Sequence, residues 1–420
     1  MRGLLQDTAT LLPFGRLPAR LPWRGGVSRQ AFALLASAAL FSLPAHAKEG
    51  DTFQPFISYT RYYDSNLYRL AASEKNLVPQ LSDQYGVLSA GLNIDWQPGR
   101  QRVIASASKN LVRFSRYSHL DYDGSDYQLK WNWQLGNRWS GQVGATESTT
   151  QSSLSDQLGL PVNNTVTREN RFANADWQFH PRWHVGLGAA AVTSTNSTAL
   201  RAPLDYEDTS VSATLGYTTP KGSKLRGQLR QVDGEYPNRP MVFLDRFYTQ
   251  TEYNLLGDWN LTGKLTARGR IGYTQRENDT QSQRDFSGVT GRLSADYFPT
   301  GKTMLTWAAY REIANSDDLN ASYQLNTGTS LGAAWLITSK ITLRANGSFE
   351  NRNFEGDTGV VIPGLVQRDE DTLSGSLSLS YAPVRMATID VGLQAGRRDS
   401  NMAVNDYTFR SVFVSVRADF

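Results

Sequence analysis

The chain has no cysteine among its 420 residues. Disulfide scaffolds, zinc sites built from thiolates and cysteine nucleophiles are therefore excluded. After residue 47 no run approaches the ~20 apolar residues that a membrane helix needs, which excludes a polytopic helical protein. The formal net charge of +4 comes from five arginines and one acid within the first 47 residues, and the rest of the chain is balanced. The basic pI of about 9.1 therefore makes no case for a nucleic-acid partner.

The first 47 residues have the pattern of a secretory signal peptide. An arginine-containing segment precedes the short apolar run Ala31–Phe41, and small residues follow at Ala45-His46-Ala47. A charged start, a short apolar core and small residues before the cut are typical of cleaved export signals. The apolar core is short for a retained anchor, so we predict cleavage after Ala47 and a mature chain of residues 48–420.

The mature chain alternates between apolar and polar residues in segments of about ten. In residues 265–274, for example, Leu, Ala, Gly, Ile and Tyr alternate with Thr, Arg, Arg, Gly and Thr, and the segment 387–395 behaves in the same way. Segments of this length and period are typical of tilted strands that cross a bilayer. A soluble β-sandwich also alternates, but here the polar positions carry Arg, Asp, Gln and Asn while the others are small or apolar.

Tight turns recur at intervals of about 41 residues. They are predicted at Pro98-Gly99, Gly136-Asn137, His180-Pro181, Pro220-Lys221-Gly222, Thr262-Gly263, Pro299-Thr300-Gly301, Thr338-Ser339 and Pro383-Val384. Each interval holds two strands and one longer connection, so eight short turns join nine hairpins. We predict an all-β chain that forms a single closed antiparallel transmembrane β-barrel of about 18 strands. An even count leaves both termini at the short-turn end, which is periplasmic in bacterial outer-membrane barrels.

Aromatic residues support this orientation. Tryptophans lie within about six residues of the short turns, at positions 96, 133, 139, 177, 183, 259, 307 and 335. Amphipathic rings collect at the boundary between lipid and water, although hairpin ends of a soluble protein would also bury such rings. The last segment alternates from Val412 to the terminal Phe420, as expected of a closing strand with a lipid-facing row. The sequence therefore predicts a protein of the bacterial outer membrane, in contact with its lipid and with its assembly machinery.

A short motif near the mature N-terminus points to one family. It follows Tyr63 and consists of Asp64, Ser65, Asn66, Leu67, Tyr68, Arg69 and Leu70. It resembles the opening segment of the β-barrel porins encoded in exopolysaccharide operons (EpsL-like proteins). The resemblance implies an outer-membrane channel that exports an extracellular polysaccharide together with periplasmic polysaccharide-export and chain-length proteins. The alternative is a general or anion-selective diffusion porin, and a third possibility is a plugged barrel with a structural or adhesive role.

The polar rows are expected to line a water-filled lumen, because side chains do not fill a barrel of 16–18 strands. The predicted lumen-facing substrate contacts are basic: Lys130, Arg226, Arg230, Arg268, Arg270, Arg276, Arg292 and Arg344. Fewer inward acids are expected, namely Asp176, Asp296, Glu350 and Asp390. Basic rings favour anions, so these residues would draw a polyanionic sugar chain. The competing interpretation is that they pair with acids on neighbouring strands and brace the wall.

The long connections supply two further hypotheses. Tyrosines lie near them at positions 63, 68, 117, 122, 206, 236 and 407, where they could stack on sugar rings or simply pack within loops. The connection from Asn66 to Asp83 mixes leucines with charges, so it is expected to fold inward or pack at the mouth as a constriction. Residues 151–165 and 353–367 form similar connections.

No constellation in the sequence supports catalysis. His119 beside Asp121 and Asp123 is the one candidate group, and exposed Asp-rich loops usually only hydrate or bind Ca²⁺ weakly. No cluster has the spacing of a metal site, and glycines such as Gly222 are not followed by the helix that a phosphate loop requires. We therefore predict neither an enzyme nor a cofactor.

Overall fold

The computed structural model describes residues 52–156, 162–239, 245–280, 282–316, 321–355 and 367–420. The predicted signal peptide lies outside the described residues. The first nine strands are β1 (Phe53–Asp64), β2 (Asp83–Trp96), β3 (Arg102–Phe114), β4 (Tyr122–Leu135), β5 (Trp139–Gln151), β6 (Thr165–His180), β7 (Trp183–Asn196), β8 (Tyr206–Thr218) and β9 (Lys224–Glu235). The remaining strands are β10 (Phe247–Thr262), β11 (Leu265–Asn278), β12 (Phe286–Thr300), β13 (Thr303–Asn315), β14 (Tyr323–Leu336), β15 (Ile341–Glu355), β16 (Asp369–Val384), β17 (Ala387–Ser400) and β18 (Tyr407–Asp419).

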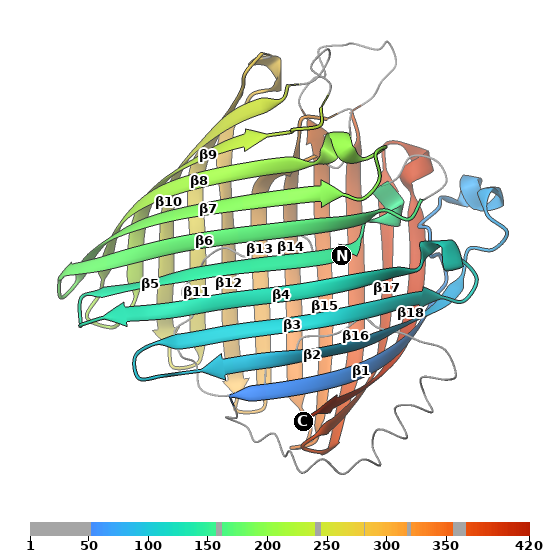
Figure 1. The fold of residues 1–420 in the computed structure, drawn as a ribbon, viewed down its shortest axis with the longest axis horizontal. Coiled ribbons are helices and arrows are strands. Elements are labelled where there is room, and N and C mark those ends of the chain that lie inside the picture. Colours follow the sequence, from blue (N-terminus) through green and yellow to red (C-terminus); the bar gives the residue numbers. More distant parts are fainter. Residues whose placement is uncertain (1–51, 157–161, 240–244, 281, 317–320, 356–366) are drawn as a thin grey trace.

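The strands form one closed antiparallel sheet of 18 strands, which confirms the predicted fold. Each strand pairs with its neighbours along the chain, and β1 pairs with β18 from Phe56↔Asp419 to Asp64↔Ser411. In Figure 1 the front strands β1–β9 run across the back strands β11–β17, as expected when all strands tilt against the barrel axis. Closure gives every strand two partners, so no edge is left to face lipid.

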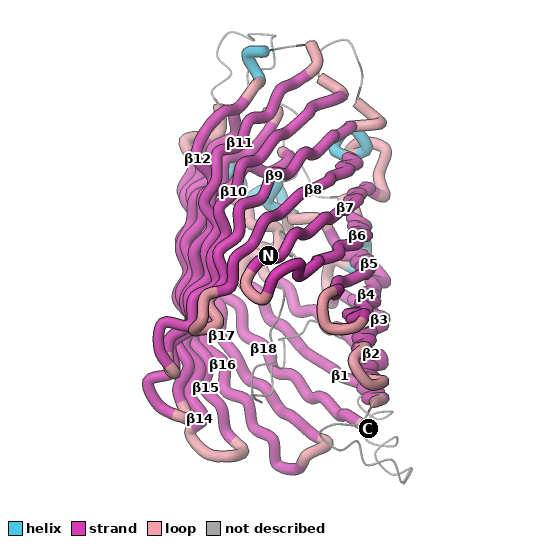
Figure 2. The backbone as a smooth tube through the Cα atoms, turned by 90° about the vertical axis from the view of Figure 1, so that its left-hand side faces the viewer, coloured by secondary structure: helices cyan, strands magenta, loops and turns pink. Residues whose placement is uncertain are grey.

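Short turns occupy one end of the barrel and long connections the other. The eight short turns fall where the sequence predicted them, for example between β4 and β5 at residues 136–138. Gly136 has a φ of 59°, a left-handed conformation that favours glycine. Figure 2 shows the barrel from the side, with the short helices, in cyan, toward one end and turns joining the strands at the other. Because the strand number is even, β1 begins and β18 ends at the short-turn end.

The long connections contain short 3-10 helices. These are η1 (Ala72–Leu77), η2 (Ser118–Leu120), η3 (Leu154–Asp156), η4 (Ala202–Leu204), η5 (Ser282–Arg284) and η6 (Ala403–Asn405). Among the described residues, no helix is long and apolar enough to cross a bilayer.

The strand register shows which residues lie on the outer face of the wall and which lie on the inner face. Residues that pair directly across an antiparallel ladder point to the same side. Leu377, Leu393 and Val412 form one such chain of partners across β16–β18, and all three are exposed on the outside. A row of the other parity, Thr372, Arg398 and Tyr407, points inward. The outer face is thus apolar, as a lipid-facing wall requires.

Tryptophans form a ring on the outer face near the short turns. Seven of the predicted ring members are exposed by about two fifths to a half, at positions 96, 139, 177, 183, 259, 307 and 335. Trp139 and Trp177 are cross-strand partners whose rings stack with centroids 5.7 Å apart. The girdle predicted from the sequence is therefore present, and it marks the lower boundary of the apolar belt.

Candidate functional site

All eight predicted basic residues lie on inward-facing rows, but their surroundings differ from the expectation. Arg226 pairs with Asp258 at 2.6 Å, Arg230 with Glu252 at 2.8 Å, and Arg268 with Asp296 at 3.2 Å. Arg344 donates to the hydroxyl of Ser380 at 2.6 Å, and Lys130 is half-buried on β4. Arg226, Arg230 and Arg268 are therefore engaged with carboxylates of the wall. Whether any of the eight contacts a solute stays a prediction.

Two buried carboxylates organise this network. Glu312 on β13 accepts hydrogen bonds from Arg270 at 2.7 Å and from Arg292 at 2.6 Å. Glu252 on β10 pairs with Arg230 at 2.8 Å and with Arg270 at 3.7 Å. The side chains of both glutamates are at most 7% exposed. Charges this deeply buried are tolerated only when they are paired, so each arginine braces the wall.

The network continues toward the long-loop end, where hydrogen bonds connect side chains of β8 with side chains of β13. The Tyr248 hydroxyl donates to Asp208 on β8 and lies 3.1 Å from the side-chain oxygen of Asn315 on β13, and Arg276 donates to Asn315 at 3.0 Å. Asn315 in turn donates to Asp208 at 3.2 Å. Asp208 and Asn315 meet although they are five strands apart along the wall, so β8–β13 curve tightly around these side chains. We call the inward side chains of β8–β13 the charged corner.

The expected excess of inward bases is wrong. Inward bases of the strands are Arg102, Lys130, Arg168, Lys224, Arg226, Arg230, Arg268, Arg270, Arg276, Arg292, Arg344, Arg352, Arg398 and Arg417. Inward acids match them in number: Asp64, Asp83, Asp95, Asp126, Asp176, Asp208, Glu252, Asp258, Asp296, Glu312, Glu350, Glu370, Asp390 and Asp419. The sequence predicts only four of these inward acids, namely Asp176, Asp296, Glu350 and Asp390. Many of the others, such as Glu252 and Glu312, were found only when the strand faces were assigned.

A different surface lines the lumen across β14–β17. Two of its mid-strand inward rows are uncharged and small or polar, with Ser330, Ser348 and Ser374 in one and Asn346, Ser376 and Gln394 in the other. We call this surface the neutral wall. Asn346 and Gln394 are exposed although they point into the barrel, and both are cross-strand partners of Ser376. Water therefore reaches the inner face of the barrel at this height.

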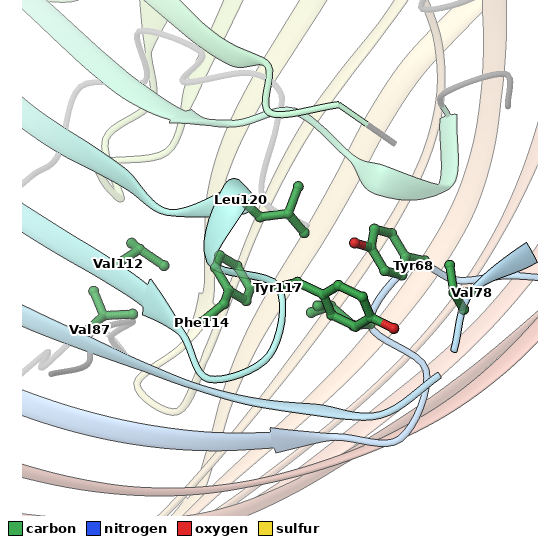
Figure 3. Packing of buried hydrophobic residues seen from close by; sticks show 8 residues of the cluster. Tyr68, Val78, Val87, Val112, Phe114, Tyr117 and Leu120 are labelled. Carbon is green, nitrogen blue, oxygen red and sulfur yellow. The ribbon is translucent and has the colours of Figure 1, made fainter. Parts of the chain in front are cut away.

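The first long connection packs against the inner wall, as its apolar content predicted. Leu67, Tyr68 and Val78 are buried against Val87 and Phe114 of β2 and β3. In Figure 3, Tyr68 and Val78 lie to one side of Tyr117 from the next connection, and Phe114 and Val87 lie to the other. Burial raises the pKa of the Tyr68 hydroxyl, with smaller contributions from Tyr117 and Asp83. The connection thus occupies part of the barrel mouth next to β1–β3.

The motif that suggested the family resemblance builds this connection. Both carboxylate oxygens of Asp64 accept hydrogen bonds from Arg69 at 2.8 Å. Asn66 binds the backbone of Leu70 through both side-chain atoms, at 2.9 and 3.0 Å. Arg69 has a φ of 58° and its guanidinium lies 3.8 Å from the centre of the Phe409 ring. These residues therefore have a clear structural role in turning the chain into the lumen.

The loop tyrosines are mostly packed rather than open to the lumen. Tyr68 and Tyr117 contact edge to face, Tyr206 packs on Tyr236, and Tyr407 lies under Arg398. Tyr122 packs beside the same cluster as Tyr68. Tyr63 points outward and is 45% exposed. Loop packing is therefore the better interpretation of these residues.

The candidate catalytic group, His119 with Asp121 and Asp123, makes hydrogen bonds and an ion pair that hold the same connections in place. His119 Nε2 lies 3.2 Å from the Tyr68 hydroxyl, Asp121 accepts from the Phe114 amide at 2.7 Å, and Asp123 pairs with Arg113 at 2.7 Å. In the part of the chain that the structure describes, His and carboxylate residues form no group of three that could hold a metal ion.

Comparisons with known proteins give distant likenesses and one family match. No curated protein matches the chain. Solved structures similar to it include OpdK from Pseudomonas aeruginosa (11% identity, 88% of this chain, 99% of that chain, TM-score 0.45). A BenF-like porin from Pseudomonas fluorescens (9%, 88%, 99%, 0.46) and OprD from Pseudomonas aeruginosa (10%, 88%, 94%, 0.44) are further examples.

Residues 256–420 match the family model described as "Putative beta-barrel porin 2". The match covers β11–β18 and the lower part of β10, so it includes about half of the charged corner and all of the neutral wall. A closed barrel with a lipid-facing apolar belt, an aromatic girdle and this family match identify the chain as a porin-like barrel of the bacterial outer membrane.

Proposed function

We propose that the chain is a passive diffusion porin that admits small hydrophilic solutes with little preference for either sign of charge. The supporting observation is the exposure of Asn346 and Gln394 on the inner face of the wall. Uncharged amides and hydroxyls both donate and accept hydrogen bonds, so a hydrated solute passing them keeps its partners. A channel of this kind needs no bond chemistry.

The balance of lumen charges argues for weak selectivity. Anion-selective pores carry rings of basic residues that face the ion path. Here Arg226, Arg230 and Arg268 are bound by acids of the same wall at 2.6–3.2 Å. A neutralised ion pair leaves only a weak field at a distance, so we expect anions and cations to pass at similar rates.

Polysaccharide export is the second candidate, and it depends on the resemblance carried by the motif from Asp64 to Leu70. In the barrel the motif folds the first connection against β2 and β3. This role is compatible with either function, so the motif does not favour export over diffusion. The two candidates predict different phenotypes on deletion: loss of small-solute uptake for a porin, and loss of extracellular polysaccharide for an exporter.

Planar bilayer recording tests the proposal. The purified barrel should give stepwise conductance in potassium chloride and a reversal potential close to zero under a salt gradient. Liposome swelling with neutral sugars of increasing size should show uptake that falls steadily with mass. A barrel without conductance, or one with strong anion selectivity, contradicts the proposal. Export without solute uptake in cells would favour the second candidate.

A further inference from the structure

Basic side chains gather on the outer face of the barrel where its first and last strands meet, on β18 and β1–β3 (Figure 1). Register places Arg61, Gly86 and Arg113 in one outward row, so two arginines flank a glycine. Lys109 lies on the same face of β3, four residues below Arg113, and the exposed Arg410 lies on the outer face of β18. We call Arg61, Lys109, Arg113 and Arg410 the outer basic patch. Charged side chains on a lipid-facing wall are costly, so the patch calls for an explanation.

The patch lies at the upper edge of the apolar belt. Gly86 and Arg113 are each ten residues from the girdle-level partners Trp96 and Val103. With a rise of about 2.5 Å per tilted residue this is about 25 Å, which is the height of the belt. Lys109 begins about 10 Å lower, and a long lysine side chain reaches the boundary by extending along the wall. Since short turns are periplasmic in bacterial outer-membrane barrels, the patch lies among the headgroups of the outer leaflet.

Neighbouring side chains hold the two arginines of the row on the surface. The Arg61 guanidinium donates to Gln84 at 3.1 Å and to Ser115 at 2.8 Å, so it extends across β2 toward the end of β3. Arg113 pairs with Asp123 at 2.7 Å, but both side chains are at least 40% exposed. An ion pair this exposed contributes little to stability, so an anion with several oxygens can compete with Asp123 for the guanidinium.

The outer face of β8–β11 carries the opposite charge toward the same end of the barrel. Asp233 and Glu277 flank Thr249 in one outward row, as the two arginines flank their glycine. Glu207 lies on the next outward row of β8, and all three acids are exposed. The outer rim is therefore polarised, so a lipid phosphate is attracted to β18–β3 and repelled from β8–β11.

A groove of about 430 Å³ lies on the outer wall below the patch. Apolar side chains that line it include Leu92, Ala105, Ala107, Leu129 and Ala145. Its volume and apolar lining suit the hydrocarbon part of a ligand. Ala107 lies two residues below Lys109 on the same face of β3, so the groove begins beneath the patch. Glu147 and Glu169 line the groove on β5 and β6, which directs a phosphate to the other side, toward Arg113.

We propose that the outer basic patch binds the phosphorylated headgroup of lipopolysaccharide, with an acyl chain in the groove beneath it. Lipopolysaccharide forms the outer leaflet of the bacterial outer membrane and carries phosphate groups at both ends of its lipid A sugar pair. Arginine pairs with phosphate through a fork of N–H donors, and clustered basic residues at a membrane surface attract anionic headgroups. The site lies on the outer face, so it does not depend on the solute path proposed for the lumen.

Native mass spectrometry of the purified barrel tests the site, with deep-rough lipopolysaccharide as the probe. EDTA is present throughout, so that divalent cations cannot bridge phosphates to acidic side chains. Arg61→Gln and Arg113→Gln should each weaken binding by at least about five-fold, because each removes a charge-assisted contact with phosphate. Asp123→Asn should strengthen binding, because it removes the carboxylate that competes for Arg113.

The matched control is Arg311→Gln, which removes an exposed outward arginine of β13 outside the patch. It should change binding by less than about two-fold, since a single distant surface charge contributes little. Heat-modifiable migration on gels shows whether each variant has folded. Unchanged binding in both patch variants, an equal loss in Arg311→Gln, or a loss in Asp123→Asn overturns the proposal.

Further titrations distinguish lipopolysaccharide from other occupants of the patch. Phosphatidylglycerol, which has a single phosphate, should bind at least about ten-fold more weakly, and inorganic phosphate should not displace the bound lipopolysaccharide. Equal affinity for phosphatidylglycerol would indicate a general anionic-lipid surface, and displacement by inorganic phosphate would indicate a site for the free ion. A wild-type barrel with the mass of two chains and no lipopolysaccharide would assign the face to a second copy. Each of these three results overturns the proposal.

Discussion

The charged corner and the neutral wall are built from the same strand pattern, yet they use the inward rows in opposite ways. In the charged corner, arginines and carboxylates meet within 3.2 Å and their side chains fill the space between β8 and β13. On the neutral wall, Asn346 and Gln394 remain open to water. The corner therefore stabilises the barrel, while the adjoining neutral wall supplies the path under the proposed function. The difference shows that an inward charge does not by itself mark a solute contact.

The largest difference between the charged corner and the neutral wall should appear in the free energy of unfolding of their variants. Glu312→Leu removes the shared acceptor of Arg270 and Arg292 and leaves both guanidiniums without that carboxylate. Breaking a buried pair by removing one partner costs about 3–5 kcal/mol. Ser376→Ala on the neutral wall should change the free energy of unfolding by less than about 0.5 kcal/mol. Urea unfolding of both variants in lipid vesicles measures the contrast, and equal losses would contradict it.

Single-channel conductance should depend more on the neutral wall than on the charged corner. Ser376→Trp places a large ring on the open inner face, so we expect single-channel conductance to fall by roughly half. Tyr248→Phe in the charged corner alters a side chain that is already buried and should leave conductance near the wild-type value. Planar bilayer recordings of the two variants compare the regions directly. A greater loss in Tyr248→Phe would place the solute path along the corner instead.

Ion selectivity should shift less, and only when several charges are removed together. Replacing Arg268, Arg270 and Arg292 with Gln leaves Asp296, Glu252 and Glu312 without these partners. The lumen then gains negative charge, so cation permeability relative to anions should rise by about two- to three-fold. Reversal potentials in a salt gradient report this ratio. An unchanged ratio in folded barrels would show that the corner lies outside the ion path.

The smallest effect is expected at the first long connection. Arg69→Ala removes the bidentate contact with Asp64 and the packing on Phe409. The connection should loosen while the barrel unfolds at nearly the same urea concentration, with a loss of about 1–2 kcal/mol at most. Proteolysis of the folded barrel should become faster within residues 66–82. Arg116→Ala, an exposed change in the next connection, is the control and should leave the rate unchanged.

Most of the fold could be predicted from the sequence, because alternation and turns are local signals. The eight short turns, the strand count and the inward direction of Arg268 and Arg292 all follow from periodicity and spacing. The outer-membrane location follows from the same apolar rows and from the aromatic girdle.

The partners of the inward charges could not be predicted, because they depend on tilt and register between distant strands. Arg270 binds Glu312 two strands away, and Asn315 meets Asp208 across 107 positions of sequence. No local pattern encodes these distances. The count of inward acids failed for a different reason, because the sequence analysis assigned inward acids on only a few of the strands. A systematic parity count over every strand would have found Glu252 and Glu312.

The most direct test measures access to the neutral wall in a conducting barrel. Gln394→Cys provides the sole thiol in the chain, on the inner face at mid-strand. Adding a bulky, membrane-impermeant thiol reagent during bilayer recording should lower the current in discrete steps, while Leu393→Cys, one residue away on the outer face, should not respond. A current that ignores modification at position 394, or that falls after modification at position 393, would contradict a solute path along this wall.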